Sequence, residues 1–199
     1  MAKVNTTAYI ILGLLKHEDL SGYDIKKRID MMISHFWEAG YGQIYPTLKT
    51  LEEDGWIHKR SGGVGKGPER NIYSITEAGK AALQVWLEIP EAKEYTRYEI
   101  LLKLFFGSLV APYENIRRIE LFKERHEQNL KIIHTFAHNL EQVLHEDEDH
   151  LYYYLTVLFG EQVYKAYLQW AEQATELLRK REGIQRDEES ILEERSEEN

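Results

Sequence analysis

The stretch that most constrains the fold of this 199-residue chain is residues 41–56, YGQIYPTLKTLEEDGW. Three apolar residues in it, Ile44, Leu48 and Leu51, recur at the period of a helix and predict one buried stripe. Gly55 is suited to end that helix, because glycine adopts the left-handed backbone of a helix C-terminus without strain. The stretch therefore predicts a short helix that docks on a core through one face and leaves the other face free.

The free face of this helix carries polar groups close to its start. Pro46 lacks a backbone N–H and is tolerated only near the first turn, so the helix should begin close to Gly42. Gln43, Lys49 and Thr50 then point away from the core. A helix that presents amide and basic groups on its first turns is typical of a recognition helix that reads the major groove of DNA.

Two more helices are expected upstream. Ser21 suits the N-cap of one of them, because its hydroxyl can accept a hydrogen bond from a backbone N–H that lacks a helical partner. Asp24, three residues on, resembles the second member of a capping box with a shortened acid. The buried face of this helix is expected to contain Ile25, Ile29 and either Met32 or Ile33. Residues 8–15 form an apolar helical run before it.

Two short strands and a fourth helix should follow. Residues 56–60 and 71–75 have the composition of strands, and the glycine-rich segment SGGVGKGPER between them suits the tip of a hairpin. Thr76 is placed to cap the next helix. The buried face of that helix is expected to contain Leu83, Trp86 and Leu87. Three helices, a two-stranded wing and a fourth helix make a winged helix-turn-helix.

The motifs of this half occur together in one known family. SGYDI at residues 21–25, IYPTLKTLEEDGW at residues 44–56, the glycine-rich wing and YSITEAGK at residues 73–80 follow the order and spacing of the PadR family of bacterial transcriptional regulators, which the chain resembles. The resemblance is dense over the first half and extends more loosely to about Arg181, as in the subfamily with a large helical C-terminal domain. It implies a homodimer that binds operator DNA, usually as a repressor, and is released by a small molecule that differs between members.

The second half of the chain has the pattern of long helices. One helix is expected over residues 95–108, and two longer ones over residues 112–144 and 151–181, joined by a polar turn as an antiparallel hairpin. About 30 helical residues span roughly 45 Å, which is more than a compact domain of this size covers. Helices of this kind bury their apolar stripes across a subunit interface, which favours a homodimer.

The expected fold is therefore mainly α with a small β-wing. The chain should contain a winged helix-turn-helix DNA-binding domain (residues 1–90), a C-terminal antiparallel helical domain for dimerisation and effector binding (residues 91–182) and a charged tail that is frayed or disordered (residues 183–199).

The net charge of −9 lies wholly in the second half. Residues 1–90 hold 11 basic and 11 acidic residues, whereas residues 91–199 hold 14 and 23. In the first half the basic residues cluster at residues 26–28, 59–60 and 66–70. Because salt screens charges beyond about 8 Å, phosphate contacts need only a local basic surface, and the acidic total does not exclude DNA binding.

The residues expected to contact DNA are Ser21, Tyr23, Gln43, Tyr45, Pro46, Lys49, Thr50, Lys66 and Arg70. Gln43 is the best candidate for base reading, because a terminal amide can both donate and accept at adenine. Lys49 and Thr50 flank it. Tyr45 either contacts the DNA backbone or packs within the protein. Tyr23 and the two wing residues should contact phosphate and set register rather than sequence.

Several other functions are disfavoured. The chain has no cysteine, which rules out disulfides and thiolate metal sites and fits a reducing cytoplasm. The apolar run of residues 8–15 is too short to cross a membrane. The glycine-rich segment has no Ser or Thr after Lys66 and joins two strands, so it lacks the context of a phosphate-binding loop. His134 and His138 have a spacing compatible with a divalent metal, but a solvated or interface pair is the simpler interpretation.

No arrangement of nucleophile, base and orienting group is found, so the chain is not expected to be an enzyme or to need a cofactor. Besides double-stranded DNA, the expected partners are a second copy of the chain and a small aromatic effector. The alternative is a winged-helix protein–protein interaction module without specific DNA binding.

Aromatic residues crowd the helical half, and they have two interpretations. They form a packed core, as aromatics commonly do, or they line a pocket in which an aromatic effector stacks. In the second interpretation the effector-binding candidates are Phe105, Tyr152, Tyr153 and Trp170.

Overall fold

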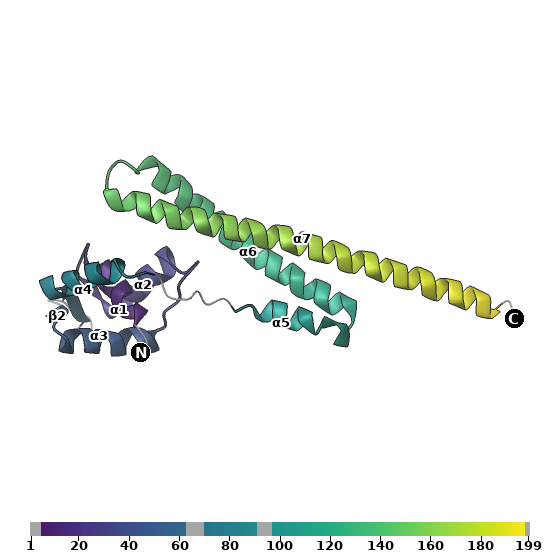
Figure 1. Cartoon of the computed structure of the whole chain (residues 1–199), viewed down its shortest axis with the longest axis horizontal. Coiled ribbons are helices and arrows are strands. Elements are labelled where there is room, and N and C mark those ends of the chain that lie inside the picture. Colours follow the sequence, from purple (N-terminus) through teal and green to yellow (C-terminus); the bar gives the residue numbers. More distant parts are fainter. Residues whose placement is uncertain (1–4, 63–69, 91–96, 198–199) are drawn as a thin grey trace. The chain divides into compact units, whose positions relative to one another are not determined.

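The computed structural model describes residues 5–62, 70–90 and 97–197, without the side chains of Arg70 and of residues 182–197. In chain order its elements are α1 (Thr6–Leu15), β1 (Leu20–Ser21), α2 (Gly22–Met32), α3 (Tyr41–Glu53), β2 (Ile57–Gly62), β3 (Arg70–Ile75), α4 (Glu77–Leu87), α5 (Glu99–Phe105), the 3-10 helix η1 (Gly107–Leu109), α6 (Pro112–Gln142) and α7 (Glu148–Glu197). The chain divides into two compact units, residues 1–94 and 95–199 (Figure 1).

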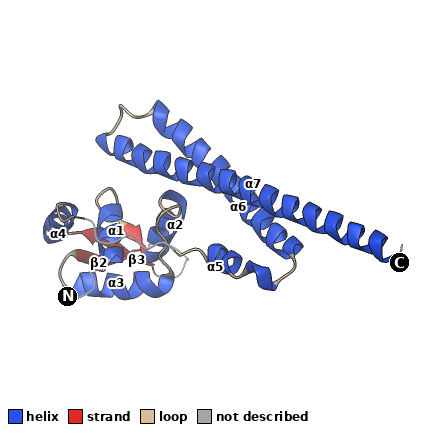
Figure 2. Cartoon of the chain, turned by 45° about the vertical axis from the view of Figure 1, so that its right-hand side comes forward, coloured by secondary structure: helices blue, strands red, loops and turns tan. Residues whose placement is uncertain are grey.

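The first unit is a winged helix-turn-helix, as predicted, with four helices around a small sheet (Figure 2). The sheet has three antiparallel strands in the order β1-β3-β2. β3 pairs with β2 from Ile57↔Ile75 to Gly62↔Arg70, and with β1 at Leu20↔Tyr73. The strand β1 was not predicted, because two residues are too few to show the alternation that marks a strand.

The core of this unit is made by the stripes that the periodicity predicts. Ile44, Leu48 and Leu51 of α3 are at most 1% exposed, and Gly55 has the left-handed backbone expected after the helix, with φ of 72°. The helix α3 begins at Tyr41, next to the start predicted close to Gly42, and Pro46 is its sixth residue. The missing N–H of Pro46 removes one internal hydrogen bond, and the helix continues through it because the buried stripe holds both sides.

The helix caps follow the sequence with one change. The Ser21 hydroxyl accepts from the backbone N–H of Asp24 at 3.2 Å and donates to the Asp24 carboxylate at 2.6 Å. The acid therefore closes on the cap hydroxyl rather than on the cap backbone. At the start of α4, the Thr76 hydroxyl accepts from the backbone N–H of Gly79 at 3.1 Å and donates to the Gly55 carbonyl at 2.8 Å.

The buried face of α2 is as predicted, whereas α4 differs at one residue. Of the two alternatives at the end of α2, Ile33 packs on the core and Met32 is exposed. In α4, Leu83 packs on the core, but Leu87 is 67% exposed because it lies at the last residue of the helix, beyond the core. Trp86 is half-buried and stacks on Tyr9 of α1 with ring centroids 4.7 Å apart and planes within 5°.

The second unit is an antiparallel hairpin of α6 and α7, which lie side by side in Figures 1 and 2. Ile133, Val157 and Tyr164 are buried between the two helices. α7 continues to Glu197, beyond the end predicted at Arg181. The helix predicted over residues 95–108 is shorter, because α5 ends at Phe105 and η1 follows. Among the described residues, no helix has both the length and the apolar content of a membrane span.

Candidate nucleic-acid interface

One side of α3 is exposed along its length, opposite the buried stripe. Its exposed candidates are Gln43, Tyr45, Pro46, Lys49 and Thr50. Lys49 Nζ lies 3.6 Å from the carboxylate of Glu53, both well exposed. The Thr50 hydroxyl donates to the carbonyl of Pro46 at 3.2 Å. Exposed ion pairs contribute little to stability, so Lys49 can exchange Glu53 for another anion at small cost.

Gln43 has a role in the helix that was not predicted from the sequence. It is the third residue of α3, and Gly40 is the N-cap. Its amide oxygen, Oε1, accepts a hydrogen bond from the backbone N–H of Gly40 at 3.2 Å. This is half of a capping box. The motif is hard to find in the sequence because glycine stands where a serine or threonine usually marks it.

The tyrosines of α3 stack against the start of α2. The rings of Tyr41 and Tyr45 lie 6.0 Å apart and within 20° of parallel, and Lys26 Nζ is 6.0 Å from the centroid of Tyr41. The ring of Tyr45 lies over Gly22, where an added Cβ would meet Tyr45 Cε1 at 2.7 Å. Tyr45 is thus packed on α2 and still 50% exposed, which leaves its outer edge open to a ligand.

The start of α2 places one candidate at the surface and one in the interior. Tyr23 is 56% exposed. Ser21 is 4% exposed, and its hydroxyl is used in the cap of α2. The geometry therefore gives Ser21 a capping role and does not support the expected contact with DNA. Tyr23 is the residue at this helix start that a large ligand can reach.

In the basic clusters at residues 26–28 and 59–60, three of the five basic side chains are paired with acids. The pairs are Lys26 with Asp30, Arg28 with Glu18, and Arg60 with Asp19, the last at 2.8 Å. Lys27 and Lys59 have no acidic partner within the part of the chain that the structure describes. All three acidic partners are exposed. Because exposed ion pairs contribute little to stability, a phosphate group can replace the acidic partner at small cost.

The wing candidates are only partly described. Lys66 lies outside the described residues, and of Arg70 only the backbone is placed, opposite Gly62 at the start of β3. Their expected phosphate contacts stay predictions.

The four effector-binding candidates do not come together within one chain. Phe105 of α5 is 82% exposed, Tyr152 of α7 is exposed, and Tyr153 and Trp170 of α7 are half-buried. Tyr152 and Trp170 are separated along α7 by about 27 Å, at 1.5 Å per helical residue. A small molecule cannot touch both residues of the same helix.

A different set of aromatic residues does cluster in the helical unit. Its members are Tyr98, Phe122, His126, Tyr164, Tyr167 and Trp170. The hydroxyls of Tyr98 and Tyr167 lie 2.6 Å apart and share a hydrogen bond. Burial, and then the bond to Tyr98, raise the pKa of Tyr167 well above its ordinary value. Only Trp170 of this cluster was among the effector candidates, and the contact between residues 98 and 167 has no local signal in the sequence.

His126 lies inside this cluster. Its ring is 4.9 Å from that of Tyr167 and 4.2 Å from that of Phe122. Its Nδ1 atom is buried and has no hydrogen-bond partner among the described residues. Burial, followed by the charge of Arg125, lowers the pKa of His126. The lowered pKa favours the neutral form of this packed imidazole.

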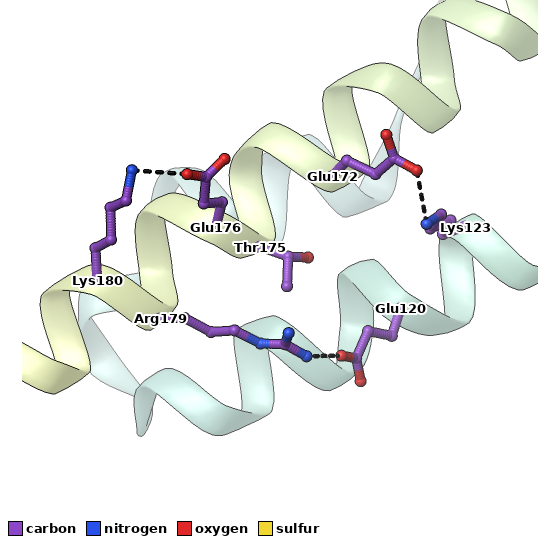
Figure 3. A pocket seen from close by; sticks show the side chains of 7 residues that line it. All are labelled: Glu120, Lys123, Glu172, Thr175, Glu176, Arg179 and Lys180. Atoms are coloured by element: carbon purple, nitrogen blue, oxygen red, sulfur yellow. Dashed lines mark hydrogen bonds and ion pairs between the residues drawn. The ribbon is translucent and has the colours of Figure 1, made fainter.

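A hollow of about 520 Å³ lies between α6 and α7, and Figure 3 shows its lining. The lining residues are Glu120, Lys123, Glu172, Thr175, Glu176, Arg179 and Lys180. Their charges are paired within the hollow: Lys123 with Glu172 at 2.8 Å, and Arg179 with Glu120 at 2.7 Å. None of the expected effector-binding residues lines it, and six of its seven lining residues are charged.

One histidine of the pair considered as a metal site, His134, contacts a residue of α7. His134 Nε2 lies 3.2 Å from the carboxylate of Glu161, which also pairs with Lys165 at 2.5 Å. Among the described residues, no three histidine, aspartate or glutamate side chains come together as metal ligands.

A winged helix-turn-helix with an exposed polar face on its third helix, followed by a long helical hairpin, defines a class of DNA-binding transcriptional regulators. Residues 11–85 match the transcriptional regulator PadR-like family, and residues 96–179 match the family described as virulence activator alpha C-term. The chain is 31% identical over 174 residues to the negative transcriptional regulator PadR of Bacillus subtilis. The matched stretch covers 82% of this chain and 92% of that protein. The chain belongs to the PadR family.

Solved structures agree with this assignment. Bacillus subtilis PadR in complex with operator DNA is similar with a TM-score of 0.78 and 28% identity, over 88% of this chain and 99% of that one. The same protein in complex with p-coumaric acid is similar with a TM-score of 0.66 and 27% identity, over 89% of this chain and 98% of that one. The relatives are transcriptional regulators and not enzymes, as expected for this chain.

Proposed function

We propose that the protein is a homodimeric repressor that binds a palindromic operator through α3 and is released by a small aromatic molecule. The observation that carries the proposal is the exposed polar side of α3, which lies opposite a fully buried stripe. This arrangement fixes the helix on the core and leaves its outer side to a major groove. The structure of Bacillus subtilis PadR with operator DNA supports this use of the fold.

The DNA contacts that we propose are divided by role. Gln43 reads a base, with Lys49 and Thr50 beside it, and Tyr45 lies at the edge of the same surface. Tyr23 and the wing residues Lys66 and Arg70 contact phosphate and set the register, which carries no sequence information. Lys27 and Lys59, which lack acidic partners among the described residues, join this second group.

A second copy of the chain is proposed to cover the apolar surface of the helical unit. The exposed apolar residues on the first half of α7 are Leu151, Tyr152, Leu155 and Phe159, each at least 48% exposed. Contiguous apolar surface of this kind normally marks an interface. A two-fold dimer would hold two α3 helices at a fixed separation, which predicts half-sites one helical turn apart, about 34–36 Å, or a multiple of it.

The effector is proposed to act through the helical unit. The p-coumaric acid complex of Bacillus subtilis PadR supports an aromatic small molecule. The aromatic cluster around His126 is a place where stacking groups are already assembled. To weaken operator binding tenfold, the effector must prefer the released arrangement by about 1.4 kcal/mol.

A titration of the full-length protein with duplex DNA at several salt concentrations tests this function. Replacing Lys66 or Arg70 with alanine should weaken specific and non-specific duplexes alike and lower the salt slope by about one per lost phosphate contact. Sedimentation should show a dimer. The alternative, a winged-helix module that binds protein, is favoured if no duplex binds with salt-dependent affinity, and a monomer at micromolar concentration contradicts the dimer.

A further inference from the structure

The capping contact of Gln43 fixes the orientation of its amide group. The partner atom is the backbone N–H of Gly40, which can only donate. The side-chain atom 3.2 Å from it must therefore be the oxygen, Oε1. The nitrogen, Nε2, makes no hydrogen bond with any residue that the structure describes. The amide thus has one end bound to its own helix and one end open.

The usual way for glutamine to read DNA uses both ends of the amide. Oxygen accepts from the N6 amino group of adenine while nitrogen donates to N7. In this protein, that mode requires the oxygen to leave Gly40 or to serve a second donor while it caps the helix. Leaving Gly40 costs the first turn of α3 one of its few caps, because no side chain of the N-cap residue is present to replace it.

We propose that Gln43 reads the operator as a hydrogen-bond donor only. Nε2 donates to an acceptor on the major-groove edge of one base in each half-site, while Oε1 stays on the N–H of Gly40. The acceptors on that edge are N7 of a purine, O6 of guanine and O4 of thymine. This inference rests on the proposed role of α3 as the DNA-reading helix, and it names which chemical group of the base that helix requires.

The cap also explains how a flexible side chain can discriminate between bases. A free glutamine loses rotamer entropy when a base fixes it, and this loss weakens binding. The contact with Gly40 restricts Gln43 before DNA arrives. The donor is then presented in a defined position relative to the helix, and this lowers the entropy lost on binding.

Base analogues separate the two modes of reading. Duplexes that bind the full-length protein are first selected from a randomised pool, and the base pair whose preference disappears in Gln43→Ala is identified. Analogues then delete one group at a time at that pair: 7-deazapurine or 4-deoxy-thymine analogues remove an acceptor, and purine in place of adenine removes the N6 amino donor. We expect loss of the acceptor to weaken wild-type binding by about three- to tenfold, the size of one hydrogen bond, and loss of the amino group to leave it unchanged.

Gln43→Glu is the matched variant, because a carboxylate still accepts from Gly40 but has no donor. We expect it to keep the protection of the Gly40 N–H from hydrogen exchange and to lose the base preference, whereas Gln43→Ala should lose both. Equal weakening by removal of the amino group and of the acceptor would overturn donor-only reading, and so would a base preference that survives in Gln43→Glu. If the wild type selects no sequence from the pool, the proposed function itself fails. If it selects a sequence whose preferences all survive in Gln43→Ala, only the role of Gln43 fails.

Discussion

Replacing Gly79 with alanine should destabilise the winged helix, because the added methyl group would meet backbone. A Cβ at this position would lie 2.2 Å from the carbonyl oxygen of Trp56 and 3.0 Å from Cγ1 of Ile75. That oxygen also accepts from the backbone N–H of Thr76 at 3.0 Å. The carbonyl therefore cannot move aside without loss of the hydrogen bond that joins β2 to the start of α4.

The loss of stability in Gly79→Ala is best measured relative to Gly13→Ala, because an added Cβ at Gly13 meets nothing within 4 Å. Both changes gain about 0.5–1 kcal/mol from the higher helix propensity of alanine. Overpacking costs Gly79→Ala about 1–3 kcal/mol, and more where the obstacle is rigid. The difference between the two variants isolates that cost, because the propensity gain is common to both.

Urea unfolding followed by tryptophan fluorescence measures this difference. Three of the four tryptophans, at positions 37, 56 and 86, lie in residues 1–94, so the signal mainly reports the winged helix. We expect a lower midpoint for Gly79→Ala than for wild type, a midpoint at or above wild type for Gly13→Ala, and similar slopes for all three. A Gly79→Ala midpoint equal to that of Gly13→Ala would show that the junction of β2 and α4 yields easily and would refute the reasoning.

Three further predictions follow from other contacts. Gly22→Ala should displace the ring of Tyr45 and weaken binding of duplex DNA in a fluorescence-anisotropy titration. The same change should have little effect in a Tyr45→Ala background, because no ring then lies over residue 22. Equal losses of affinity in both backgrounds would contradict the contact. Burial lowers the pKa of His126, so the unfolded chain binds a proton at this histidine more readily than the folded chain. The stability that this difference contributes should be complete above the ordinary histidine pKa of about 6.5 and should fall as the pH drops towards the folded pKa. Urea midpoints from circular dichroism at pH 7.5 and 5.5 should therefore differ more for wild type than for His126→Leu, and an equal difference would exclude His126 as the cause. Tyr98→Phe should lower the stability of the hairpin by about 0.5–1.5 kcal/mol through loss of the hydrogen bond to Tyr167, measured in the same way, with no loss if that bond does not form in solution.

The parts of the fold that sequence could predict are those set by local spacing. The stripe of Ile44, Leu48 and Leu51 and the caps at Ser21 and Thr76 depend on residues within one or two turns, so pattern alone finds them. The parts that it missed depend on distant partners. β1 exists only because two residues pair with β3, which lies about fifty residues further along the chain.

The candidate interface shows the same limit. The outward side of α3 was predictable, because it is the complement of the buried stripe. The burial of Ser21 and the bond between Gln43 and Gly40 were not, since one depends on the tertiary core and the other on a cap without its usual residue. The sequence shows that aromatic residues are abundant in the helical half. Helical spacing does not show which of them come from facing helices and meet in one cluster.

The parallel stack of Tyr9 on Trp86 provides the winged helix with an intrinsic spectroscopic probe. Aromatic rings held in one orientation give circular dichroism bands in the near ultraviolet, and these bands vanish when fixed packing is lost even if helices persist. The helices α6 and α7 hold 31 and 50 residues, more than α1–α4 together, so the far-ultraviolet signal reports the helical unit more strongly than the winged helix. The part of the near-ultraviolet signal that is lost when Tyr9 or Trp86 is replaced therefore reports the docking of α1 on α4, separately from the helix content of the hairpin.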